Sequence, residues 1–98
     1  MDQIQRVMVV VIDGVRADAV PLFQLPALRA LMARGASTLH ATTVTPSVTA
    51  AALGSLFSGL RPDDHGLDSD KFKIPRPRVA LQPMPRTLRE AGIPTYCF

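Results

Sequence analysis

Asp13 is the first residue whose type and position could support chemistry. It follows an unbroken apolar run, residues 7–12, and it precedes Gly14. In open α/β sheets, ligands gather at the carboxyl ends of the strands, so a carboxylate at this point is placed to bind a divalent cation or to act as a nucleophile. The structural alternative is that Asp13 only forms a tight turn with the glycine. These residues alone favour neither interpretation.

A second group of candidates consists of hydroxyl side chains just ahead of an alanine-rich segment. Thr45, Ser47 and Thr49 precede a stretch that reads as a helix from Thr49 to Phe57. A hydroxyl at a helix amino terminus faces free backbone N–H groups and the positive end of the helix dipole, which favours an alkoxide and an incoming phosphate or sulfate. Capping of the helix by Ser47 or Thr49 is the simpler explanation of this feature taken alone.

The elements that must position these residues alternate between strands and helices. The continuous apolar run at residues 7–12 is typical of a strand covered on both faces. Proline at position 26 and glycine at position 35 delimit a helix, and Gly92 ends another helix at 86–91. Short strands are predicted at 37–43 and 93–98, and a long proline-containing loop at 61–83. The order predicts an α/β fold in three layers, with a mainly parallel sheet and helices on both faces.

Composition is consistent with one small folded domain. The chain has 98 residues, of which 47% are hydrophobic and 19% charged, so a packed core is expected rather than disorder. The net charge is +3, and four of the eleven basic residues lie at 71–78. In that stretch Phe72 is the single interleaved aromatic residue and no recognition motif is present, so a solvated loop is favoured over a nucleic-acid site.

The compartment and the partners are predicted from the absence of a cysteine pair, a secretory signal and a membrane-spanning segment in the given sequence. Cys97 is the single cysteine, so no intrachain disulfide can form, and a buried structural thiol is expected. No secretory signal is visible, and no apolar run is long enough to span a bilayer. We therefore predict a cytoplasmic protein, with neither a nucleic acid nor a membrane as partner.

Taken together, the two groups of candidates resemble a known family. Asp13-Gly14, a hydroxyl at a helix start some three dozen residues later, and then Gly59-Leu60-Arg61-Pro62 before His65-Gly66 resemble the amino-terminal part of the alkaline phosphatase superfamily. That superfamily includes the sulfatases and the nucleotide pyrophosphatase/phosphodiesterases. The segments at 25–28, with Gly35, and at 87–95 also match. The resemblance implies that residues 1–98 are the amino-terminal fragment of a single catalytic α/β domain.

The resemblance also implies a mechanism. It makes Thr49, sixteen residues before His65, the nucleophile, with Thr45 beside Pro46 as the runner-up. Two metal ions, expected to be zinc, have ligands that include Asp13 and the Thr49 oxygen, and the remaining ligands are expected beyond residue 98. The expected reaction is hydrolysis of a small-molecule phosphate or sulfate ester through a covalent threonyl ester.

Other polar residues receive structural roles. His65 is expected to close the turn after the nucleophile helix, and His40 has no matching role in the family. Arg16 and Asp18 match family positions, but a salt bridge or a turn explains them equally well.

Two features depart from the family pattern. The residues around Thr49 lack the Cys-x-Pro-x-Arg context of arylsulfatases. The phosphodiesterase asparagine after His65-Gly66 is also missing, and Asp70 in that region is expected to repel phosphate. The alternative function is a truncated or degenerate homologue without catalytic activity. The 98-residue chain alone is expected to be inactive, and poorly soluble because of an apolar edge at 93–98.

Overall fold

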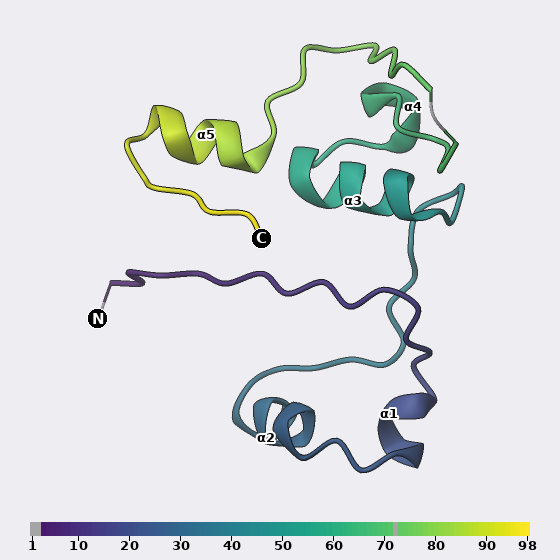
Figure 1. The fold of residues 1–98 in the computed structure, drawn as a ribbon, viewed down its shortest axis with the longest axis vertical. Helices are drawn as coiled ribbons and strands as arrows, with labels where there is room; N and C mark the ends of the chain where they lie inside the picture. Colours follow the sequence, from purple (N-terminus) through teal and green to yellow (C-terminus); the bar gives the residue numbers. More distant parts are fainter. Residues whose placement is uncertain (1–2, 72) are drawn as a thin grey trace. The chain divides into compact units, whose positions relative to one another are not determined.

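The structure is a computed structural model that describes residues 3–71 and 73–98. Its helices in chain order are α1 (Ala19–Leu22), α2 (Pro26–Arg34), α3 (Thr49–Ser58), α4 (Pro62–His65) and α5 (Met84–Glu90), as Figure 1 shows. The chain divides into two compact units, Met1–Ala41 and Thr42–Phe98. The first unit therefore holds α1 and α2, and the second holds α3, α4 and α5.

The predicted three-layer α/β fold with a mainly parallel sheet is wrong. Residues 3–71 and 73–98 contain helices, turns and irregular backbone but no strand. The apolar run at 7–12 is solvent-exposed, with Val10 at 70% and Ile12 at 68% of full exposure. A buried strand requires neighbouring strands that pair with its N–H and C=O groups and helices that cover both faces. In the described part of the first unit, residues 3–41, there are two helices and no partner strand, so the run stays exposed.

The predicted strands at 37–43 and 93–98 are wrong for the same reason. Neither segment is paired with another strand. The carboxyl-terminal segment is exposed throughout, and it includes Cys97, which was expected to be buried. A cysteine in an apolar stretch is buried only when other elements pack over that stretch, and the described residues place none there.

Two helices follow the predicted boundaries because their signals are local. α2 begins at Pro26, which occupies the first helical position, and it ends at Arg34 before Gly35. α3 begins at Thr49 as predicted and continues one residue past Phe57. At its end, Gly59 adopts a left-handed conformation with φ 71°, and its N–H donates to the Ser55 carbonyl at 2.9 Å. This arrangement is typical of a glycine that ends a helix.

The shorter helices were less visible in the sequence. α1 and α4 are single turns that were not predicted from the sequence, and α4 lies inside the predicted loop at 61–83. α4 begins with Pro62 at its first position and ends at Gly66, which has φ 76°. α5 confirms the predicted helix at 86–91, although it spans Met84–Glu90. Helices of one turn contain too few residues to show a hydrophobic period.

The buried centre of the second unit lies where α3 meets α4. Ala51 on α3 is fully buried, and so is His65 at the end of α4. Pro62, at the start of α4, is also buried. The one turn of α4 therefore packs against the middle of α3, and this packing supports the helix that begins with Thr49.

Candidate functional site

Thr49 lies at the exposed start of α3. It is the first helical residue, and Val48 occupies the N-cap position with extended backbone, φ −116° and ψ 156°. Neither Ser47 nor Thr49 therefore holds the N-cap position. The hydroxyl of Thr49 instead belongs to the first turn, where backbone N–H groups lack carbonyl partners within the helix. That turn carries the positive end of the helix dipole.

Asp70 provides the side-chain hydrogen-bond acceptor that the N-cap residue, Val48, does not provide. The N–H of Ala50, the second residue of α3, donates to Asp70 Oδ1 at 2.9 Å. A carboxylate at this end of a helix satisfies one free N–H group and interacts favourably with the dipole. The sequence predicts only that Asp70 repels phosphate and gives no sign of this contact. The two residues are separated by 20 positions, so no local pattern signals it.

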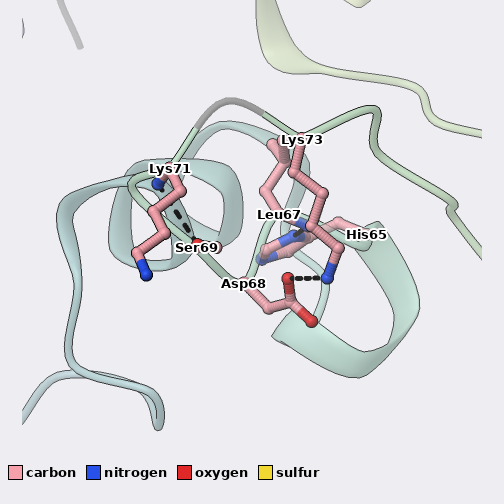
Figure 2. A network of polar contacts seen from close by, with 6 residues as sticks. All are labelled: His65, Leu67, Asp68, Ser69, Lys71 and Lys73. Carbon is pink, nitrogen blue, oxygen red and sulfur yellow. Dashed lines mark hydrogen bonds and ion pairs between the residues drawn. The ribbon is translucent and has the colours of Figure 1, made fainter.

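His65 is held inside the second unit by both of its ring nitrogens. Its Nδ1 accepts a hydrogen bond from the Leu67 N–H at 3.0 Å, and its Nε2 lies 3.0 Å from Ser55 Oγ. Figure 2 shows the ring beside Leu67. Because Nδ1 accepts, the proton of the neutral ring lies on Nε2 and is donated to Ser55. The ring is 0% exposed, which supports the structural role predicted for His65.

Gly54 makes room for that ring. A Cβ added at Gly54 would lie 2.7 Å from His65 Cε1 and 3.0 Å from each ring nitrogen. Only a residue without a side chain allows the imidazole this close to α3. Gly54 and Ser55 therefore anchor α4 on the same helix that presents Thr49.

Replacing Gly54 with alanine should destabilise the second unit. Alanine gains about 1 kcal/mol of helix propensity over glycine, but overlap with a packed side chain costs about 1–3 kcal/mol. We expect the overlap to prevail, because two hydrogen bonds hold the ring, and the net loss of unfolding free energy should be up to about 2 kcal/mol. Urea denaturation of the variant measures it. In a His65→Ala background the same change should be neutral or stabilising, and an equal loss in both backgrounds would contradict this explanation.

Asp13 is exposed and lies in the first unit. Its Oδ1 accepts a hydrogen bond from the Gly14 N–H at 2.8 Å, and Gly14 has φ 72°. The two residues therefore form a tight turn, and the carboxylate lies at the surface of the unit. Nearby, Arg16 and Asp18 form a salt bridge, one of the two structural roles considered for them, with Nη2 and Oδ2 2.8 Å apart. Both side chains are largely exposed, so the pair adds little stability.

The loop after α4 carries a second ion pair. Lys73 Nζ lies 2.9 Å from Asp68 Oδ1, as Figure 2 shows. The hydrogen bond from Lys73, followed by its charge, lowers the pKa of Asp68 below its usual value. The loop also borders an open hollow of about 570 Å³. Its charged lining residues are of both signs: Asp63, Asp68, Lys73, Arg76 and Arg78.

The sequence model of the type I phosphodiesterase / nucleotide pyrophosphatase family matches residues 7–82. The chain belongs to this family. The match confirms the predicted resemblance to the alkaline phosphatase superfamily, and it spans Asp13, Thr49, His65 and Asp70. No curated protein and no solved structure matches the chain.

Membership of the type I phosphodiesterase / nucleotide pyrophosphatase family makes a phosphoester hydrolase the kind of enzyme to which the chain is related. The family is generally metal-dependent and acts on small phosphodiester substrates. Within residues 3–71 and 73–98, no three His, Cys, Asp or Glu side chains are grouped closely enough to hold a metal ion. Among those same residues, no helix is long and apolar enough to cross a membrane.

Proposed function

We propose that the enzyme containing this chain hydrolyses phosphate diesters with Thr49 as its nucleophile. The observation that carries the proposal is the position of Thr49, exposed in the first turn of α3 and inside the region that matches the phosphodiesterase family. An oxygen nucleophile at this point lies at the positive end of the helix dipole, where negative charge on an attacking oxygen or a phosphate is stabilised.

Asp13 and Thr49 are proposed as ligands of divalent metal ions, with zinc as the expected metal. A carboxylate and a hydroxyl are oxygen donors, which divalent cations accept. Two residues are too few for a two-metal site, so other residues of the enzyme must complete it. When bound, the ions make the threonine hydroxyl more acidic and neutralise charge on the phosphoryl group.

The reaction assigned to Thr49 proceeds in two displacements. Its Oγ1 gives the hydroxyl proton to solvent and forms a bond to phosphorus, while the bond from phosphorus to the leaving oxygen breaks and that oxygen keeps the electron pair. A water oxygen then gives up a proton and forms a bond to phosphorus, the bond from phosphorus to Oγ1 breaks, and Oγ1 takes up a proton, which regenerates the threonine. α3 holds the hydroxyl on a helix that Gly54 and Ser55 anchor to His65. Rigid elements of this kind fix a nucleophile more closely than a loop does.

Removal of metal tests the metal-dependent part of the proposal. Dialysis against EDTA should reduce the hydrolysis of bis(p-nitrophenyl) phosphate by about 100-fold or more, since metal activation supplies several kcal/mol of transition-state stabilisation. Zinc should restore the rate, and magnesium and manganese provide the comparison. Full activity after chelation would contradict the role of metal. Absence of hydrolysis with every metal would instead support the alternative, a homologue without catalytic activity.

A further inference from the structure

The start of α3 carries an anionic side chain as well as a hydroxyl. Asp70 Oδ1 accepts the Ala50 N–H at 2.9 Å, one residue along the chain from Thr49. Both Asp70 and Thr49 are exposed. A substrate phosphoryl group that approaches Thr49 would therefore come close to a carboxylate as well as to the positive end of the helix dipole.

Asp70 and Asp68 lie in the same loop but differ in whether a cation compensates their negative charge. Asp68 is paired with Lys73 at 2.9 Å, so its negative charge is matched by a cation. In the part of the chain that the structure describes, the ion pairs are Arg16–Asp18 and Lys73–Asp68, and neither includes Asp70. The helix N–H group solvates Asp70 but does not cancel a full charge, because a helix end carries only about half of one.

We propose that Asp70 is a specificity-determining residue that disfavours dianionic substrates at Thr49. The inference rests on the proposed role of Thr49 as nucleophile. Near neutral pH a phosphate monoester carries close to two negative charges, since its second pKa is about 6, whereas a diester carries one. Coulomb repulsion scales with the charge of the substrate, so Asp70 penalises the monoester more than the diester. The same carboxylate positions the first turn of α3.

Asparagine separates the two roles of Asp70. Its side-chain oxygen can still accept the Ala50 N–H, so Asp70→Asn keeps the hydrogen bond while removing the charge. Asp68→Asn is the matched control, because it removes a carboxylate two residues away whose charge Lys73 already compensates. Hydrogen exchange of the Ala50 amide verifies that the first turn of α3 is intact in both variants.

The experiment compares kcat/KM for p-nitrophenyl phosphate and for methyl p-nitrophenyl phosphate, which share a leaving group, in the enzyme containing this chain. Asp70→Asn should raise the monoester-to-diester ratio by about tenfold at low ionic strength, the effect of one unit charge within about 10 Å at an effective dielectric constant of about 20. The change should shrink at high salt. Asp68→Asn should leave the ratio as it is. A solely structural role for Asp70 would alter both substrates equally.

The outcomes separate this inference from the proposed function. If Thr49→Ala is inactive but Asp70→Asn leaves the ratio unchanged, the specificity role of Asp70 is overturned and the proposed function stands. If Asp68→Asn shifts the ratio as much as Asp70→Asn does, the assignment to Asp70 is overturned as well. If Thr49→Ala remains active, or the unmodified enzyme hydrolyses neither ester, the proposed function fails and this inference fails with it.

Discussion

Replacing Thr49 with alanine should lower kcat/KM for a phosphate diester by several orders of magnitude. The substitution removes the atom that forms the covalent intermediate, and losses of a covalent nucleophile are of that size. The fold should change little. Alanine is the best helix former, and Thr49 does not hold the N-cap position of α3. Steady-state kinetics with bis(p-nitrophenyl) phosphate, together with the helical circular dichroism of the variant, measure both effects.

Thr45→Ala is the matched control for this prediction. Thr45 is also an exposed threonine ahead of α3, and it precedes Pro46. It lies outside the helix, so its hydroxyl lacks the first-turn position that favours an alkoxide at Thr49. Its loss should reduce the rate only slightly. Equal losses at the two positions would leave the assignment of Thr49 unsupported, and a larger loss at Thr45 would transfer the role to that residue.

Replacing Gly66 with alanine should produce the largest loss of stability in the second unit. Gly66 has φ 76°, and a Cβ added there would lie 2.8 Å from the backbone carbonyl carbon and oxygen of Arg76. The left-handed conformation costs a non-glycine residue about 1–2 kcal/mol, and overlap costs about 1–3 kcal/mol. Backbone atoms cannot rotate away as a flexible side chain can. The unfolding free energy should therefore fall by about 2–5 kcal/mol in urea denaturation.

Gly59→Ala measures the cost of the left-handed backbone conformation separately from the cost of atomic overlap. Gly59 ends α3 with φ 71°, close to the value at Gly66, but an added Cβ there meets no atom within 4 Å. The variant should lose only about 1–2 kcal/mol. The difference in unfolding free energy between the two variants then measures how tightly residues 76–78 pack against α4. The same packing includes the hydrogen bond that the Arg78 N–H donates to the Asp64 carbonyl at 2.9 Å. Equal losses would show that Arg76 can move away.

The parts of the fold that follow from local sequence were predictable. Pro26 and Gly35 delimit α2, and the alanine-rich stretch after Val48 forms α3, because proline, glycine and alanine act on their own few residues of backbone. The strands were not predictable in this way. Whether an apolar run such as residues 7–12 becomes a strand depends on partners elsewhere in the chain, and the described residues provide none.

In the candidate site, too, features that depend on local sequence were predictable and contacts between distant residues were not. Asp13 was predicted from its place between an apolar run and Gly14, and Thr49 from its place at a helix start and from the family resemblance, which puts the nucleophile sixteen residues before His65. The family match includes these positions. The contact of Asp70 with Ala50 joins distant positions, so only the structure shows it. The close fit of the His65 ring against Gly54 was missed for the same reason. Glycine inside a helix was the available signal, since it lowers helix propensity and often marks a close approach.

Detection of the covalent intermediate tests the role of Thr49 most directly. The enzyme containing this chain is mixed with excess bis(p-nitrophenyl) phosphate, quenched in acid during steady-state turnover, digested and analysed by mass spectrometry. We predict a nitrophenyl phosphoryl group on the peptide that contains Thr49, with fragmentation placing it on that side chain and with no adduct in Thr49→Ala. An adduct on Thr45 or on any other residue, or turnover by Thr49→Ala at the unmodified rate, would contradict the central claim.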